Sequence, residues 1–175
     1  MKVTLMAVQS LDGFITRPGV PGAGFASAAD RAHFRAALAV FDCAVLGRVT
    51  YESARTDGTP PPATGRRRVV FTRSPDRYLE QAVRDSLEFT ADPPGDVLAR
   101  LQAAGRRSCA LLGGSQVHQL FLGAGLVDEI WLTVEARLFA GGTPLVAAPA
   151  DVRLALQSHE GIGDDALLLK YVVCR

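Results

Sequence analysis

The chain has 175 residues, of which 48% are hydrophobic and 21% charged, and this balance predicts one globular domain over residues 1–175 with a single core. A formal net charge of +1 gives no general attraction to nucleic acid or to a membrane surface. The apolar run at the N-terminus is too short for a signal sequence or a membrane span, so we expect a cytoplasmic protein without nucleic-acid or membrane partners.

The cysteines and histidines form no metal or disulfide pattern. Cys43, Cys109 and Cys174 each lie alone in an apolar stretch, and the three histidines are scattered along the chain. Metal sites need ligands at closer spacing, and disulfide frameworks need an even number of cysteines. We therefore expect buried free thiols and no metal site.

The first half of the chain alternates apolar runs with helical patterns. Residues 2–8 predict a strand because they are apolar and β-branched, and an Asp-Gly turn follows. Ser27 is a favourable N-cap before apolar residues at helical spacing, which predicts a helix over 27–40. Residues 42–47 predict a buried strand, and 48–53 predict the start of a short helix.

The middle of the chain continues this alternation after a proline-rich loop at 59–65. The expected order is strand, strand, helix, strand and helix, over residues 68–72, 86–90, 96–104, 109–112 and 115–122. Strands that alternate with helices of this length predict βαβ units around a largely parallel sheet.

The last third contains strand patterns only. Residues 128–138 predict one long strand, while 152–160 and 166–174 predict an antiparallel hairpin around the turn Gly-Ile-Gly-Asp-Asp. The predicted fold class is therefore α/β, with a mixed, mostly parallel central sheet, an antiparallel C-terminal hairpin and flanking helices.

Three predicted strands end in small or polar turns, at residues 45–50, 69–74 and 111–116. Ligands bind outside the carboxyl ends of the strands in an open α/β sheet, so these ends can face one extended ligand such as a dinucleotide. Gly47 leaves room for close backbone approach, Arg48 can pair with a phosphate, and the Thr50 hydroxyl can cap a pyrophosphate oxygen.

Two features of these turns have alternative interpretations. Arg73 suits a 2′-phosphate, which favours NADPH over NADH, but both Arg48 and Arg73 also fit ordinary surface arginines. Gly113 and Gly114 fit a tight turn with positive φ, and they equally fit close approach of the backbone to an anion. The residues alone leave both alternatives open.

The order of motifs resembles the dihydrofolate-reductase-like superfamily, and within it the branch that contains the reductase domain of bifunctional riboflavin-biosynthesis deaminase/reductases. The resemblance rests on SLDGFI, ADRAHF, VLGRVTYES, GRRRVVFTRS, LLGGSQVHQLFL and VDEIWLTVEARLFAGGTPL. It implies a three-layer fold that binds NADPH across the sheet and delivers hydride to a small heterocyclic or ribosylamino-pyrimidine substrate. The implied substrate is similar to 5-amino-6-(5-phosphoribosylamino)uracil, and relatives of this kind often form homodimers.

The resemblance also assigns cofactor contacts by position. Val8 and Ile15 match positions whose backbone holds the nicotinamide carboxamide. The implied phosphate contacts fall into three groups, which are Gly47, Arg48 and Thr50; Thr72, Arg73 and Ser74 at the adenosine end; and Gly113, Gly114, Ser115, Gln116 and Val117 at the pyrophosphate turn and helix start. Close approach to a pyrophosphate then becomes the better account of the two glycines.

Two carboxylates are candidates for the substrate side. Asp30 matches the acidic substrate-binding residue of dihydrofolate reductases and Thr133 matches its supporting hydroxyl, so Asp30 is the candidate catalytic residue. A carboxyl group there can bind an N–C–N edge and assist protonation if burial raises its pKa. Asp30 equally fits a plain role in the first turn of the helix. Asp12 fits a structural turn with a possible substrate contact.

The sequence departs from the riboflavin branch at two places. Leu112 stands where that branch often has an acid, and Glu135 with Ala136 stands where it has a proline. Asp30 and the stretch GRVTYES suggest dihydrofolate reductase as an alternative function, and a non-catalytic nucleotide-binding module is another alternative. His118 is interpreted as a helix residue at the cofactor rim rather than a general base.

Overall fold

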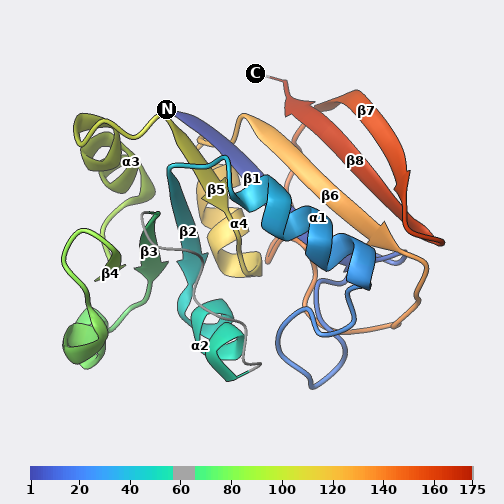
Figure 1. Ribbon diagram of the computed structural model, residues 1–175, viewed down its shortest axis with the longest axis horizontal. Coiled ribbons are helices and arrows are strands. Elements are labelled where there is room, and N and C mark those ends of the chain that lie inside the picture. The colour runs from blue at the N-terminus through green and yellow to red at the C-terminus, as the bar shows by residue number, and fades with distance from the viewer. Residues whose placement is uncertain (57–65, 175) are drawn as a thin grey trace.

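The computed structural model of the chain describes residues 1–56 and 66–174, and the proline-rich loop expected at 59–65 lies outside them (Figure 1). One eight-stranded sheet has the order β4-β3-β2-β5-β1-β6-β8-β7. The strands are β1 (Lys2–Ser10), β2 (Cys43–Gly47), β3 (Arg67–Phe71), β4 (Leu87–Thr90), β5 (Ser108–Leu111), β6 (Glu129–Glu135), β7 (Leu154–Ile162) and β8 (Ala166–Val173). The helices are α1 (Ala28–Leu38), α2 (Arg48–Thr56), α3 (Pro94–Ala103) and α4 (Ser115–Gly123), with a short 3₁₀ helix, η1, at Pro75–Gln81.

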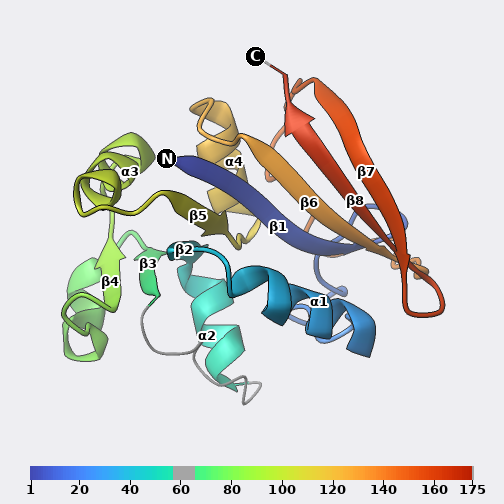
Figure 2. The same cartoon turned by 45° about the horizontal axis from the view of Figure 1, so that its top comes forward.

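The sheet is mixed, as predicted. The strands from β4 to β6 in the sheet order are paired in parallel, whereas β8 pairs antiparallel with both β6 and β7. Figure 2 shows α1 and α2 on one face of the sheet and α3 and α4 on the other. The described residues therefore form the predicted three-layer α/β architecture.

The alternation of side chains along the strands builds a core on each face. Val3 and Leu5 of β1 are fully buried in the cluster that contains α3 and α4 residues, whereas Met6 packs with Leu38 of α1. Helix α1 begins as predicted, because the Ser27 hydroxyl accepts the Asp30 N–H at 3.1 Å. The packing of both faces fixes the strand ends relative to one another.

Several strand boundaries differ from the prediction, and the contacts at the ends of β1 and β6 explain two of these differences. β1 continues past residue 8 to Ser10, because its last residues pair in register with the end of β6. β6 ends at Glu135 instead of residue 138, because the Arg137 N–H turns back to the Glu135 carbonyl at 2.7 Å. Downstream of that turn, the Asp12 carboxylate accepts the N–H groups of residues 139 and 140.

The expectations for the cysteines and for membrane spans can also be compared with the structure. Cys43 and Cys109 are buried free thiols, but Cys174 is only half-buried because it follows the last strand. No helix within residues 1–56 and 66–174 is long and apolar enough to cross a membrane.

Phe121→Ala should lower the free energy of unfolding by about 3–5 kcal/mol. The Phe121 ring is fully buried and packs edge-on against Phe71, with ring centroids 5.5 Å apart. Leu120→Ala, in the same helix and 43% exposed, is the matched control and should cost much less. Urea unfolding measures both, and equal losses would contradict the packing of α4.

Candidate active site

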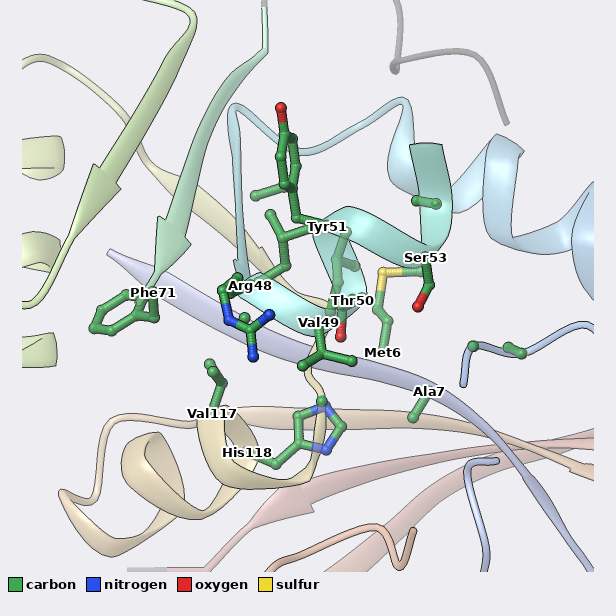
Figure 3. Close-up of a pocket in the computed structure, with 18 of the residues that line it drawn as sticks. Met6, Ala7, Arg48, Val49, Thr50, Tyr51, Ser53, Phe71, Val117 and His118 are labelled. Carbon is green, nitrogen blue, oxygen red and sulfur yellow. The ribbon is translucent and has the colours of Figure 1, made fainter. Parts of the chain in front are cut away.

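A cleft of about 2370 Å³ runs along the carboxyl ends of the parallel strands (Figure 3). Arg48 and Thr50 project from the start of α2 into the space above Val117 and His118 of α4. The expected site residues that line the cleft are Val8, Ile15, Asp30, Gly47, Arg48, Thr50, Thr72, Arg73, Ser74, Gly114, Ser115, Gln116, Val117 and Thr133. Residues that are far apart in the sequence therefore meet at one site, whereas Gly113 and Asp12 do not line it.

β1 has an open edge in this cleft. The Lys2 N–H donates to Arg107 before β5, so every second residue of β1 directs its backbone polar groups to the β5 side. β5 pairs with β1 only as far as Leu5, whereas β1 continues to Ser10. The backbone N–H and C=O of Val8 therefore point into the cleft beyond the end of β5, where they can bind an amide-like group.

The ends of β2 and β5 meet through glycine. The Gly47 N–H donates to the Gly113 carbonyl at 2.6 Å. A Cβ on Gly47 would lie 3.0 Å from Val117 Cγ2, and one on Gly114 would lie 3.5 Å from Thr50 Oγ1. The peptide bond between Gly113 and Gly114 is cis. These contacts leave a small, side-chain-free wall between α2 and α4.

The two glycines of this turn have different roles. Gly114 lines the cleft, whereas Gly113 lies behind it with φ +85°. A Cβ on Gly113 would lie 2.6 Å from Nε2 of His118. The close-approach explanation therefore fits Gly114, while Gly113 is required by its backbone conformation and by the imidazole behind it.

The start of α4 has unused hydrogen-bonding capacity. Its N-cap is Gly114, which has no side chain to accept the first N–H groups. The Ser115 side chain is buried, and its Oγ has no hydrogen-bond partner among the described residues. An anion at this helix start would satisfy both features, because it accepts from the free N–H groups and from the hydroxyl.

The adenosine end predicted from the sequence contains an aromatic stack that the sequence analysis missed. Tyr78 of η1 stacks on Phe89, with centroids 4.8 Å apart, and lines the cleft near Arg73 and Ser74. The Tyr78 hydroxyl donates to Glu52, which also pairs with Arg48 at 2.6 Å. Because the ion pair is about half exposed, it holds Arg48 only weakly against an incoming phosphate.

The opposite end of the cleft contains the buried carboxyl group of Asp30. Asp30 is 6% exposed, Glu135 5% and Thr133 2%. Burial raises the pKa of the Asp30 carboxyl, the nearby Glu135 carboxylate raises it further, and the Thr133 hydroxyl bonded to it acts in the opposite direction. The pairing of Asp30 with Thr133 therefore exists in the structure, next to a second carboxylate that sequence reasoning did not assign to the site.

Asp12 lies apart from the cleft. Its carboxylate accepts the Ser10 hydroxyl at 2.6 Å and the N–H groups of Phe139 and Ala140 at 3.0 and 2.7 Å. These hydrogen bonds lower the pKa of the Asp12 carboxyl, with the Ser10 bond having the largest effect. The structure thus gives Asp12 the role of bracing two loops, and it does not bring this carboxylate to the substrate side.

His118 is a buried residue of α4 that borders the cleft. It is fully buried, and its Nδ1 lies 2.8 Å from the Leu145 carbonyl, which fixes the proton on that nitrogen. Burial lowers the pKa of His118 to about 4. Such an imidazole is uncharged at neutral pH, so the structure agrees that it is not a general base of ordinary strength.

Signals for the missed residues were present in the sequence. Ser74 followed by Pro75 is a helix-start pattern, and it could have predicted η1 and with it Tyr78. Strand alternation places Glu135 on the same face as Thr133, two residues earlier. No group of three or more potential metal ligands was found in the described part of the chain.

The fold is that of a dihydrofolate-reductase-like domain. The chain belongs to the RibD C-terminal domain family, whose model matches residues 1–168. It is 28% identical over 132 residues to the uncharacterized protein YwjB of Bacillus subtilis, an alignment that covers 75% of this chain and 73% of YwjB.

The fold is shared with solved structures. A pyrimidine reductase-like protein from Corynebacterium diphtheriae superposes with a TM-score of 0.81 at 18% identity, over 99% of this chain and 92% of that one. Dihydrofolate reductase from Enterococcus faecalis, in complex with NADP(H), gives a TM-score of 0.72 at 20% identity, over 98% and 96%. The family and fold implied by the sequence motifs are therefore confirmed.

Gly113→Ala should destabilise the protein by about 1 kcal/mol or more, because alanine is disfavoured at positive φ and its Cβ would collide with His118. Gly95→Ala is the matched control, since Gly95 lies in α3 with nothing within 4 Å of a new Cβ, and this change should be neutral or stabilising. Thermal unfolding measures both variants. A Gly113→Ala protein as stable as the Gly95→Ala protein would contradict the proposed crowding.

Stability should fall as the pH drops from 6.5 to 4. The unfolded chain binds a proton at His118 in this range, and the folded chain does not. The buried neutral imidazole therefore contributes up to about 3 kcal/mol to the free energy of unfolding. This contribution is present above the unfolded pKa and is lost as the pH falls towards 4. His118→Gln should flatten the slope in urea unfolding, while His159→Gln, an exposed control, should leave it unchanged. Identical slopes for all three proteins would show that His118 titrates normally.

Proposed function

We propose that the protein is an NADPH-dependent reductase that delivers hydride to a small heterocyclic substrate of the ribosylamino-pyrimidine kind. The observation that carries the proposal is the alignment of three unused recognition groups along one cleft. These are the open β1 edge at Val8, the uncapped start of α4 with the unpartnered Ser115 Oγ, and the exposed Arg73 at the end of β3. Membership of the RibD C-terminal domain family and the reductase-like fold support an oxidoreductase.

The residues present fit a nicotinamide dinucleotide. Ser115, Gln116 and Thr50 would hold the pyrophosphate, because they supply N–H and hydroxyl donors beside the side-chain-free wall at Gly114. Val8 would hold the carboxamide through its backbone. When bound, the reduced nicotinamide supplies the hydride.

The 2′-phosphate is the basis for preferring NADPH. Arg73 is exposed at the cleft and forms no ion pair within residues 1–56 and 66–174. Thr72 and Ser74 add hydroxyl groups on either side of it. A guanidinium flanked by hydroxyls suits a phosphate monoester and offers little to an unmodified ribose.

At the substrate end the Asp30 carboxyl lies beside an apolar wall, and Arg31 and His33 of the same helix also line the cleft. Asp30 and Thr133 lie there, together with apolar lining residues from four elements, Met6, Phe34, Leu38, Trp131 and Leu168. A flat heterocycle fits such a wall, and the Asp30 carboxyl can hydrogen-bond its edge and provide a proton when hydride arrives. The fold neighbour from Corynebacterium diphtheriae is described as pyrimidine reductase-like, which supports a pyrimidine ring.

Dihydrofolate is a second candidate substrate, favoured by the hydrogen bond between Asp30 and Thr133. An assay of NADPH oxidation, by the loss of its absorbance, with dihydrofolate and with a set of ribosylamino-pyrimidines distinguishes the two candidate substrates. The proposal expects turnover of a pyrimidine that is lost in Asp30→Asn. Binding of NADPH without oxidation by any of these compounds would instead support a non-catalytic nucleotide-binding module.

Arg73→Ala should reduce the ratio of NADPH to NADH affinity roughly tenfold, because it removes a charge-assisted contact to the 2′-phosphate. Arg84→Ala is the control, since the Arg84 side chain is 97% exposed and lies outside the cleft. Calorimetric titration of both cofactors measures the ratio. An unchanged ratio in Arg73→Ala would refute the role of Arg73, and no NADPH binding by the parent chain at millimolar concentration would refute the cofactor.

A further inference from the structure

The end of the cleft near Arg73 contains an aromatic cluster built from three elements. Tyr78 of η1 stacks on Phe89 of β4, with ring centroids 4.8 Å apart and an interplanar angle of 14°. Tyr51 of α2 packs edge-on against the same phenylalanine, with centroids 5.2 Å apart and ring planes at 85°. The Phe89 ring is therefore held by two tyrosines, and it supports one face of Tyr78.

The other face of the Tyr78 ring is available to a ligand. Tyr78 is half-buried and lines the cleft, whereas Phe89 behind it does not. Within residues 1–56 and 66–174, Tyr78 makes no second ring contact and no cation–π contact. A supported aromatic face beside a cleft suits a flat ring, because stacking buries apolar surface on both partners.

The hydroxyl end of Tyr78 is anchored as well. It donates to one carboxylate oxygen of Glu52 in α2, and the other oxygen accepts from Arg48 at 2.6 Å. The Tyr51 hydroxyl donates to the Gln81 side chain of η1 at 3.1 Å, so α2 and η1 are joined at two places. The orientation of the Tyr78 ring is thus fixed before a ligand binds, which lowers the entropic cost of binding.

The neighbouring groups indicate which flat ring binds at Tyr78. Arg73 and Ser74 directly follow β3, Tyr78 lies in the helix that comes next, and all three line the cleft. In an adenosine nucleotide the base and the 2′-phosphate are attached to the same ribose, so their binding groups have to lie close together. Asp30, the candidate substrate acid, lies at the opposite end of the cleft. The Tyr78 face therefore fits the base of the dinucleotide better than the substrate heterocycle.

We propose that the free face of Tyr78 stacks on the adenine base of the dinucleotide, with Phe89 as the support behind it. The inference rests on the proposed reductase function and deepens it, because the phosphate contacts assign no residue to the base. A stacked base is bound through its π-face. Tyr78 then contributes to the affinity of NADPH and NADH alike, while Arg73 distinguishes the two by the 2′-phosphate.

The direct test observes the tyrosine rings in the parent protein while a ligand binds. The chain has three tyrosines, so ring-labelled tyrosine gives few NMR signals, and the signal lost in Tyr78→Phe identifies Tyr78. Adenosine 2′,5′-bisphosphate, the adenosine half of NADPH, should shift the Tyr78 ring protons upfield, because they come to lie over the base. Tyr171 of β8, which does not line the cleft, should not shift. Absence of binding at millimolar concentration, or binding that leaves the Tyr78 signal in place, would overturn the proposal.

Three variants make the affinity measurement specific. In calorimetry, Tyr78→Ala should weaken the binding of adenosine 2′,5′-bisphosphate by about fivefold or more, because a stacking ring is lost. Tyr78→Phe keeps the ring and loses only the bond to Glu52, so it should retain most of the affinity. Leu79→Ala, in the same helix, 68% exposed and outside the cleft, is the matched control and should bind like the parent. Equal losses in Tyr78→Ala and Tyr78→Phe would assign the effect to the hydroxyl and contradict stacking.

Titration of both cofactors separates this inference from the proposed function. Tyr78→Ala should weaken NADPH and NADH by the same factor, in contrast to Arg73→Ala, and a changed ratio in Tyr78→Ala would show that Tyr78 acts on the phosphate and not on the base. NADPH binding that is equal in the parent and Tyr78→Ala would refute the stacking and leave the reductase proposal in place. No NADPH binding by the parent, together with a Tyr78 shift on addition of adenosine 2′,5′-bisphosphate, would refute the reductase proposal and leave the base site standing.

Discussion

The hydrogen bond from the Gly47 N–H to the Gly113 carbonyl is the constraint on which the cleft depends. Its donor–acceptor distance is 2.6 Å, and it holds the ends of β2 and β5 together. At this spacing a Cβ on Gly47 would crowd Val117, and one on Gly113 would collide with His118. The starts of α2 and α4 are thereby placed side by side. Because β5 stops at this turn while β1 continues, the same constraint exposes the β1 edge at Val8. One junction thus creates both the donor-rich wall and the open strand edge.

The two ends of the cleft differ in electrostatic character because different elements supply them. The starts of α2 and α4 and the end of β3 bring N–H groups, hydroxyls and arginines, which favour a phosphate-bearing ligand. The start of α1 and the end of β6 bring Asp30 and Glu135 into a buried environment. Burial raises the pKa of the Asp30 carboxyl. The proposed placement of the cofactor at one end and the substrate at the other follows from this asymmetry.

The sequence predicted the order and type of most elements because apolar periodicity, N-caps and turn residues are local signals. Its errors have physical causes. β6 was predicted too long because the turn from Glu135 to Arg137 that ends it is held by contacts distant in the sequence: the Leu11 N–H donates to the Arg137 carbonyl, and Asp12 accepts the N–H groups of residues 139 and 140. The order of the motifs predicted that Val8, Thr50 and Ser115 line the site. No local pattern shows that Gly113 lies behind the cleft wall at Gly114, or that Asp12 connects two loops by hydrogen bonds. Those distinctions depend on which atoms face the cleft, and that is set by tertiary packing.

The central claim is that the open β1 edge and the start of α4 bind the reduced nicotinamide cofactor, and amide NMR with NADPH tests it most directly. The account predicts that the backbone amides of Val8, Ile15, Ser115 and Gln116 shift on titration, while those of the exposed strand β7 remain in place. Absence of any change at Val8 and Ser115, or changes confined to the β7–β8 hairpin, would contradict it.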